Sequence, residues 1–258
     1  MSAPDWNPDL YTRFAGLRLQ PALDLLARVG ALPPGPVCDL GCGTGVVGPV
    51  LRARWPDRAL TGVDASPAML EKAAQTGAYD DLTRADAALW NPATPPALIF
   101  SNALCHWLPD HANLFARLAG VLAPGGTLAV QMPRQFANPS HALMRDIAPR
   151  LFHDRFQFTD WQAPVATPVA YQRMLMPLGR VSVWETEYIQ RLDPVDHGHP
   201  VRHFTQSTAL RPFAEKLSDP ELVRFIAAYE QALTDAYPIE PDGSVIFPFR
   251  RVFFTLTV

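Results

Sequence analysis

The stretch that decides the fold is Val37-Cys38-Asp39-Leu40-Gly41-Cys42-Gly43-Thr44-Gly45, in which a short apolar run carries a carboxylate and three alternate glycines follow. Because glycine has no Cβ, the chain can turn sharply out of a strand there, and a ligand can lie against bare backbone. We expect a helix to begin directly after the glycines. The stretch therefore predicts a pocket for a nucleotide cofactor.

Two classes of cofactor fit glycines in this arrangement. Gly43 to Gly48 also match the G-x-G-x-x-G pattern of dinucleotide folds, in which a pyrophosphate rests on a helix N-terminus. Asp39 favours the other class, because a carboxylate repels a pyrophosphate but attracts a cation such as the ammonium group of S-adenosylmethionine. The sequence thus favours a sulfonium cofactor, with an NAD-dependent oxidoreductase as the alternative.

Apolar runs alternate with helical periodicity on both sides of the glycines. Apolar residues at helical spacing predict a first helix, which ends at Pro33-Pro34-Gly35. Further strands are expected at residues 59–63, 82–85, 97–100 and 127–132, with helices opened by Ser66-Pro67 and covering 109–122. This alternation predicts an α/β fold with a Rossmann-like, doubly wound and mostly parallel sheet.

The pattern changes after residue 133. Residues 133–178 contain several prolines and helical patterns without a convincing strand, and strand patterns return at 180–191 and 245–258. We expect a single domain over residues 1–258, in which two helical segments, at about 133–178 and 197–240, form a cap over the carboxyl edge of the sheet.

Composition narrows the class of protein. The chain of 258 residues is 48% apolar with a net charge of −3, which supports a core but leaves no basic stripe to follow a nucleic acid. We expect no signal sequence and no membrane span. Three cysteines make no disulfide framework, so a cytoplasmic protein is expected, with a monomer as the favoured state. His197, His199 and His203 have metal-like spacing but no acidic or cysteine partner, so no metal is expected.

Acidic side chains close three successive predicted strands. Asp64 closes the second strand, where it can accept both hydroxyls of a ribose, and Asp86 closes the third, where flanking alanines leave room for an adenine ring. Because the carboxyl ends of parallel strands meet at one edge of a sheet, these carboxylates are expected to lie along one cofactor. The cofactor-binding candidates are Asp39, Gly41, Cys42, Gly43, Gly45, Asp64, Ala65, Ser66, Met69, Asp86, Ala87 and Asn102.

His106 and Trp107 follow the fourth predicted strand, where substrate and cofactor meet in such folds. No Asn-Pro-Pro-aromatic motif occurs there, which argues against methylation of a nucleobase amine. His106 could contact a substrate, and a buried structural histidine is an equal alternative. Trp107 could form a wall of the pocket.

With these motifs in place, the chain resembles the class I S-adenosylmethionine-dependent methyltransferases and, among them, the trans-aconitate methyltransferase family. The resemblance rests largely on motifs outside the cofactor loop. They include Trp6-Asn7-Pro8-Asp9-Leu10-Tyr11, Asp64-Ala65-Ser66-Pro67-Ala68-Met69, His106-Trp107-Leu108-Pro109-Asp110-His111 and Phe247-Pro248-Phe249-Arg250-Arg251. The chain departs from the family pattern at Gln20, where relatives carry a second arginine, and at Phe204 and Ser207.

The resemblance implies transfer of the sulfonium methyl group to a carboxylate of a small polycarboxylic acid, foremost trans-aconitate, giving a monomethyl ester and S-adenosylhomocysteine. A carboxylate is already an anionic nucleophile at neutral pH, so no general base is required and positioning alone can lower the barrier by ~7–11 kcal/mol. The substrate-binding candidates are Tyr11, Arg18, His106, Trp107, Tyr171, Arg211, Arg250 and Arg251, and His106 is also the candidate catalytic residue. A methyltransferase of another small metabolite and a catalytically silent cofactor-binding protein remain alternatives.

Overall fold

The computed structural model describes residues 15–258, which fall into two compact units. Unit 1 comprises the described residues up to Pro133, together with residues 164–186 and 251–258. Unit 2 comprises residues 134–163 and 187–250. The two longest strands each contribute residues to both units.

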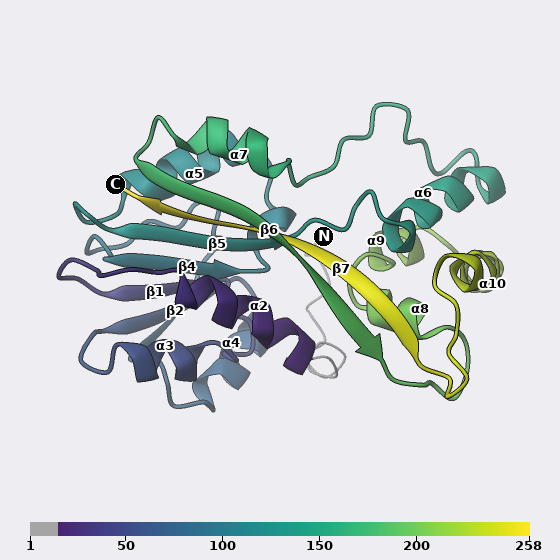
Figure 1. The fold of residues 1–258 in the computed structure, drawn as a ribbon, viewed down its shortest axis with the longest axis horizontal. Coiled ribbons are helices and arrows are strands. Elements are labelled where there is room, and N and C mark those ends of the chain that lie inside the picture. The colour runs from purple at the N-terminus through teal and green to yellow at the C-terminus, as the bar shows by residue number, and fades with distance from the viewer. Residues whose placement is uncertain (1–14) are drawn as a thin grey trace. The chain divides into compact units, whose positions relative to one another are not determined.

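Within the described part of the chain, seven strands form one sheet in the order β3-β2-β1-β4-β5-β7-β6 (Figure 1). The strands are β1 (Val37–Leu40), β2 (Leu60–Asp64), β3 (Asp81–Arg84), β4 (Leu98–Asn102), β5 (Thr127–Pro133), β6 (Arg180–Leu192) and β7 (Val245–Thr257). β1 to β5 pair in parallel, whereas β7 runs antiparallel to β5. This arrangement confirms the predicted mostly parallel, doubly wound α/β fold.

Helices cover both faces of the sheet in unit 1. α2 (Ala15–Ala27), α3 (Gly48–Arg54) and α4 (Pro67–Ala74) lie on one side, and α5 (His111–Gly120) and α7 (Pro168–Leu175) lie on the other (Figure 1). α4 begins where Ser66 and Pro67 predict, because the Ser66 hydroxyl accepts a hydrogen bond from the Met69 amide at 3.3 Å. The expected helix over 109–122 corresponds to α5, and η1 (Cys105–Trp107), a short 3-10 turn, precedes it.

The core of unit 1 lies between the central strands and their helices. Phe100 of β4 and Phe115 of α5 are both fully buried, and Phe115 packs edge-on against Phe254 of β7 with ring centroids 4.9 Å apart. Complete burial of each such side chain contributes about 1.5–3 kcal/mol to folding. This packing fixes the ends of β4 and β5, from which site residues project.

The connection between β3 and β4 contains no helix. Residues 85–97 instead form turns, and a cavity of about 1420 Å³ lies over the adjoining sheet face, lined by side chains that include Thr61, Thr83 and Trp90. Parallel sheets normally carry helices on both faces. Thr61 of β2 and Thr83 of β3 have hydroxyl groups that can hydrogen-bond to water, so this face can be partly solvated.

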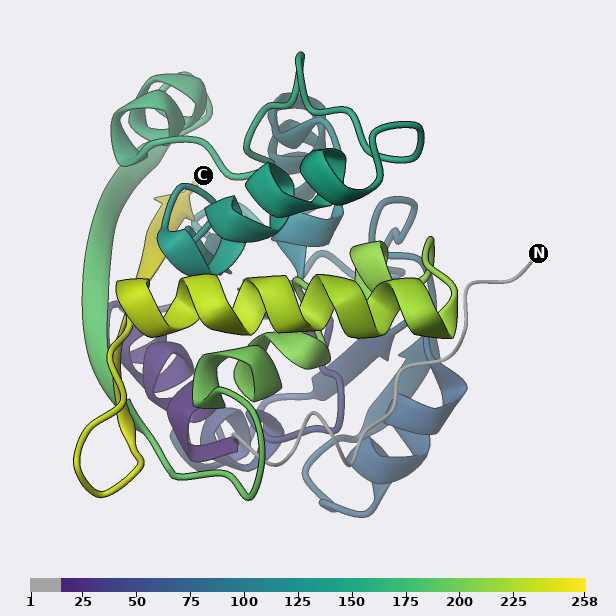
Figure 2. The same ribbon diagram turned by 90° about the vertical axis from the view of Figure 1, so that its right-hand side faces the viewer.

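Unit 2 is helical and is built around α10 (Asp219–Ala236). This helix begins with a capping box formed by Ser218 and Glu221, and it buries Phe225, Tyr229 and Leu233, which are spaced four residues apart on one face. Figure 2 shows α10 as the long yellow-green helix, and it packs against α6 (Pro139–Leu151) and α8 (Pro200–Gln206). α9 (Arg211–Ala214) precedes it.

Most of the two predicted cap segments belongs to unit 2. Residues 134–163 and 197–240 lie in it, whereas α7, at the end of the first segment, packs with α5 in unit 1. The expected position of a cap over the sheet edge stays a prediction.

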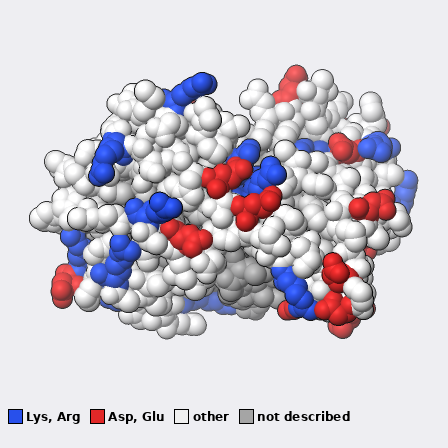
Figure 3. Space-filling view, in the orientation of Figure 1, with Lys and Arg blue, Asp and Glu red and all other residues white. Residues whose placement is uncertain are grey.

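Charged side chains of both signs are interspersed on the face shown in Figure 3. No helix within residues 15–258 is long and apolar enough to cross a membrane.

Candidate active site

The glycine loop joins β1 to α3, and its three alternate glycines all have positive φ: +78° at Gly41, +54° at Gly43 and +80° at Gly45. A Cβ at Gly41 would lie 2.7 Å from the Leu104 side chain, and one at Gly45 would lie 2.9 Å from the Ala73 backbone. A Cβ at Gly43 would meet nothing within 4 Å. Two glycines therefore let the loop pack, while Gly43 leaves backbone open to a ligand.

Asp64 ends β2 beside this loop and holds it in place. Its Oδ2 accepts the Gly43 amide and its Oδ1 accepts the Ser66 amide, each at 2.9 Å. Each carboxylate oxygen keeps a further lone pair for an incoming hydroxyl donor. The structure thus brings the predicted ribose ligand, Asp64, to the predicted loop.

Asp39 lies on β1 beneath the loop and is 1% exposed. Its Oδ2 accepts a hydrogen bond of 2.7 Å from the Tyr79 hydroxyl. Burial raises the pKa of the Asp39 carboxyl to about 7; the Tyr79 hydrogen bond opposes this increase and the charge of Asp64 adds to it. A Cβ at Gly48 would lie 2.6 Å from the Tyr79 ring, so close packing explains the last glycine of the G-x-G-x-x-G match.

Asp86 does not close the third strand as expected. β3 ends at Arg84, which lies opposite Asp64 in β2, because pairing with β2 stops there. Asp86 is exposed and opens a turn, in which its Oδ1 accepts the Ala88 amide at 2.8 Å. Its place two residues beyond the strand still leaves it at the carboxyl end of β3.

The other cofactor candidates divide between core and surface. Met69 is 4% exposed on α4, so it packs in the core. Cys42, Ser66 and Ala87 are also buried, while Ala65 is exposed.

Polar atoms without partners gather at the carboxyl ends of the central strands. Within residues 15–258, no hydrogen-bond partner is present for Oγ1 of Thr44, for Oδ1 of Asn102, or for either side-chain polar atom of Gln131. Leaving a buried polar group unpaired costs about 1–3 kcal/mol. These atoms therefore mark a surface suited to a polar ligand, and Gln131 and Thr44 are site residues that the sequence did not single out. The only signal for Gln131 was a polar residue inside the apolar run 127–132.

η1 presents His106 and Trp107 directly after β4. Their ring centroids are 4.6 Å apart, and Trp107 is 45% exposed. Beneath η1, His111 bonds through Nε2 to the Cys105 carbonyl (2.9 Å) and through Nδ1 to the Tyr171 hydroxyl (2.6 Å). Tyr171 is fully buried and its hydroxyl also accepts the Ala166 amide, so it supports η1 from within the core.

The candidate arginines lie in different places. Arg251 is 4% exposed and belongs to unit 1, whereas Arg250 belongs to unit 2 and donates through Nε to Glu187 at 2.9 Å. Arg211, also in unit 2, donates through Nε to Glu215 at 2.8 Å. Successive side chains of β7 point to opposite faces of the sheet. Arg250 and Arg251 therefore lie in different surroundings, although the sequence predicted the same role for both. Tyr11 and the side chain of Arg18 lie outside the described residues.

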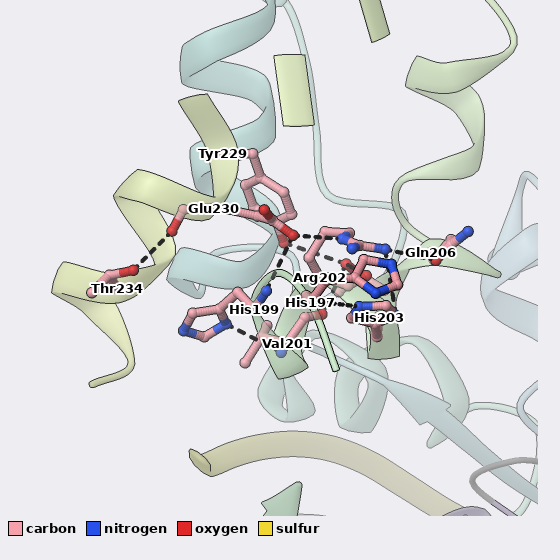
Figure 4. A network of polar contacts seen from close by, with 10 residues as sticks. His197, His199, Val201, Arg202, His203, Gln206, Tyr229, Glu230 and Thr234 are labelled. Carbon is pink, nitrogen blue, oxygen red and sulfur yellow. Dashed lines mark hydrogen bonds and ion pairs between the residues drawn. The ribbon is translucent and has the colours of Figure 1, made fainter. Parts of the chain in front are cut away.

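The histidines with metal-like spacing serve unit 2 as structural groups (Figure 4). His199 bonds through Nε2 to the Tyr237 carbonyl at 3.0 Å, and His203 bonds through Nε2 to the His197 carbonyl at 2.7 Å. No group of three or more His, Cys, Asp or Glu in the described ranges could hold a metal ion. Cys38, Cys42 and Cys105 are all free and buried.

A mostly parallel sheet, a glycine loop after its first strand and an acidic residue ending the second define a Rossmann-like fold with a site for a nucleoside cofactor. The sequence family described as "Methyltransferase domain" matches residues 11–180. The chain belongs to this family, in the branch that contains the trans-aconitate 2-methyltransferases, and this membership excludes the oxidoreductase alternative.

Two curated relatives show how far the similarity extends. The protein named trans-aconitate 2-methyltransferase from Streptomyces avermitilis is 43% identical, covering 98% of this chain and 96% of the relative. The protein of that name from Klebsiella pneumoniae is 41% identical, covering 96% of each. At this identity over nearly the whole length, the similarity extends well beyond the cofactor loop.

Solved structures support the fold alone. The YcgJ protein from Bacillus subtilis has a TM-score of 0.57 at 13% identity, covering 93% of this chain and 98% of its own. Phosphoethanolamine N-methyltransferase 2 from Haemonchus contortus, solved with S-adenosyl-L-methionine, has a TM-score of 0.56 at 16% identity, covering 96% of this chain and 56% of its own.

Proposed function

We propose that this protein is an S-adenosylmethionine-dependent O-methyltransferase that esterifies a carboxylate of a small polycarboxylic acid, foremost trans-aconitate. The observation that carries this proposal is identity of 41–43% over nearly the whole chain with several relatives named trans-aconitate 2-methyltransferase. The products would be a monomethyl ester and S-adenosylhomocysteine.

The polar groups at the strand ends suit this cofactor. Asp64 can accept the ribose hydroxyls, the open backbone at Gly43 can lie against the ligand, and Asn102 offers an unpaired acceptor. With its pKa raised to about 7, Asp39 carries only part of a negative charge beneath the loop at neutral pH, and a cationic ligand would favour its ionised form. When bound, the cofactor supplies an electrophilic methyl group on a sulfonium centre.

The protein's own contribution is positioning and exclusion of water. A carboxylate oxygen forms the new bond to the methyl carbon as the carbon–sulfur bond breaks, and the electron pair of that bond stays on sulfur. No proton moves, so no general base is needed, and His106 acts by contact with substrate rather than by proton transfer. Holding the reactants in line can supply ~7–11 kcal/mol, and removal of water from the attacking oxygen assists further.

Substrate contacts are proposed for Trp107, Arg251 and the unit 2 arginines Arg211 and Arg250. Arginines suit an acid with several carboxylates, because each guanidinium can bind a carboxylate through two parallel hydrogen bonds. We also propose that the enzyme is a monomer and that it is cytoplasmic; the three free cysteines favour a reducing compartment.

Methyl transfer from labelled S-adenosylmethionine to trans-aconitate and to a panel of di- and tricarboxylic acids tests the proposal. We expect a base-labile methyl ester, identified by mass spectrometry, to form fastest with trans-aconitate. Absence of an ester with every acid in the panel would refute the proposed function. Turnover confined to another acid would retain the ester chemistry and change the substrate.

A further inference from the structure

Two amide side chains at the ends of neighbouring strands have buried polar atoms without the hydrogen bonds that such atoms normally make. Gln131 on β5 is 0% exposed, and neither its Nε2 nor its Oε1 has a partner in the part of the chain that the structure describes. Asn102 ends β4 with its Oδ1 unpaired in the same way. Because both polar atoms of Gln131 are unpaired, exchanging its O and N assignments would not change this deficit.

Strand register places these amides on one face of the sheet. Asn102 lies opposite Gln131 in the parallel pair, and Gln131 lies opposite Phe253 in the antiparallel pair. Arg251 is two residues from Phe253, so it projects from the same face, and it is 4% exposed. The carboxyl end of β5 thus combines the unpaired amide donor of Gln131 with a buried guanidinium, and both of these groups suit a carboxylate.

The backbone beside the amides is held in an uncommon conformation. Ala103, directly after Asn102, has φ of +57° and donates its N–H to the Gln131 carbonyl at 3.0 Å. Left-handed backbone at a residue other than glycine is unfavourable and is concentrated at functional sites. The hydrogen bond ties the end of β4 to the main chain of Gln131 and leaves the Gln131 side chain for another partner.

The order of the strands in the sheet indicates that Gln131 lies near the methyl acceptor rather than near the cofactor. Asp39 and Asp64 lie on β1 and β2, and Asp86 follows β3, whereas β5 lies beyond β4 on the other side of the loop. Each strand step is about 4.8 Å, so Gln131 stands about 10 Å from β1. A cofactor held at β1 to β3 would present its methyl group towards β4 and β5, where the acceptor must lie.

We propose that the Gln131 side chain donates a hydrogen bond to the reacting carboxylate of the methyl acceptor, at the oxygen that does not attack. This inference rests on the proposed function. The other oxygen forms its bond to the methyl carbon as the carbon–sulfur bond breaks, and the carboxylate and sulfonium charges disappear together. A neutral amide orients the carboxylate while withdrawing less charge from the attacking oxygen than a guanidinium would.

Gln131→Met tests this role, because methionine nearly matches the shape of glutamine but cannot donate. The matched control is Met132→Leu, the next residue of β5, which is fully buried on the opposite face. For each protein we would measure kcat and KM for trans-aconitate, the Kd of S-adenosylhomocysteine by calorimetry, and Tm with and without trans-aconitate in the presence of S-adenosylhomocysteine.

We expect Gln131→Met to lower kcat/KM about 10- to 100-fold, the range for loss of one hydrogen bond to a charged group. Its Kd for S-adenosylhomocysteine should equal that of the wild type, and its Tm without ligand should be unchanged or higher. Trans-aconitate should raise the Tm of the wild type and of Met132→Leu, but not that of Gln131→Met.

Three results would overturn the inference. One is wild-type kcat/KM in Gln131→Met. Another is a loss of S-adenosylhomocysteine affinity as large as the loss of kcat/KM, which would assign the amide to the cofactor. The last is failure of Gln131→Met to fold, which would make the amide a structural group. A wild-type protein that methylates no acid at all would instead refute the proposed function.

Discussion

A largely buried ion pair in unit 2 contrasts with two amide side chains in unit 1 that have buried polar atoms. In unit 2, Glu230 Oε1 accepts hydrogen bonds from Arg202 Nε at 2.7 Å and from the His199 amide at 3.1 Å (Figure 4). In unit 1, the side chains of Gln131 and Asn102 have polar atoms without partners among residues 15–258. For these residues, pairing rather than burial distinguishes a group that holds the fold from groups available to a ligand.

The Arg202–Glu230 pair has a structural purpose that its position explains. Arg202 lies on α8 and Glu230 on α10, so the pair links two packed helices of unit 2. A Cβ at Gly198 would overlap the Glu230 carboxylate, so this glycine makes room for the pair.

The largest expected effect is that of Asp39 on the pH dependence of unfolding, because Asp39 is a buried carboxyl of unit 1 with Tyr79 as its hydrogen-bond donor. Its folded-state pKa of about 7 lies above its ordinary value of 3.8. The contribution of Asp39 to the free energy of unfolding is therefore complete below pH 3.8 and is lost as the pH rises through about 7. At ~1.4 kcal/mol per pKa unit, the loss could reach about 4 kcal/mol. Urea unfolding at a series of pH values should show this decline in the wild type but not in Asp39→Asn.

The exposed Asp86 supplies the control for that experiment. Asp86→Asn should keep the decline, because it leaves the Asp39 carboxyl and its Tyr79 hydrogen bond in place. Identical pH curves for the wild type and Asp39→Asn would contradict the assignment to Asp39.

Removal of the Asp64 carboxylate should weaken the cofactor site nearly as much. Asp64→Ala removes the proposed acceptor of two ribose hydroxyls and also frees the Gly43 and Ser66 amides. We expect the Kd of S-adenosylhomocysteine, measured by calorimetry, to rise about 100- to 1000-fold. Asp81→Ala, at an exposed carboxylate on β3, should leave the Kd unchanged. A change of less than about threefold in Asp64→Ala would be incompatible with a ribose contact.

Glu230→Ala should have the opposite signature, a loss of stability without a loss of binding. Arg202 would be left buried without its carboxylate, and we expect the free energy of unfolding to fall by about 2–3 kcal/mol, less than for a fully buried pair because the Glu230 side chain is 23% exposed. Glu215→Ala, which breaks a more exposed pair with Arg211, should cost less than about 0.5 kcal/mol. If Glu230→Ala weakened S-adenosylhomocysteine binding while stability was kept, the comparison between the units would fail.

The smallest effect on folding is expected at Gly43. Gly43→Ala meets no atom, so only its φ of +54° should oppose it, at about 1 kcal/mol. Gly45→Ala should cost more, because its Cβ would press on the Ala73 backbone at 2.9 Å. Thermal unfolding of both variants without ligand measures their effect on stability. Calorimetry with S-adenosylhomocysteine then measures their effect on cofactor binding. Equal destabilisation by the two substitutions would contradict the difference in local space.

Local rules explain why the cofactor loop was predictable from sequence. Glycines at positions of positive φ and a Ser-Pro helix start depend on residues close in the chain, so the sequence alone places Gly41, Gly43 and Ser66 correctly. The acidic residue at the end of β2 followed from the alternation of strands and helices. Each of these features needs only a few neighbouring residues to specify it.

Long-range contacts account for what the sequence did not predict. The end of β3 is set by pairing with β2, which put Asp86 beyond the strand. Tyr79 gave no signal, because its partner Asp39 is forty residues away. Gln131 lies in a strand buried on both faces, so periodicity could not mark its side chain as distinct. Tyr171 was predicted to bind substrate, but its hydroxyl is engaged by His111 in the core.

The helix-free connection between β3 and β4 has a consequence for local unfolding. β3 spans only Asp81–Arg84, pairs with β2 alone and borders the open sheet face, so its amides should exchange with solvent hydrogen sooner than those of β4 and β5. Asp86 lies just beyond this edge. A nucleoside held there would slow that exchange, so ligand binding would be coupled to the ordering of this edge strand.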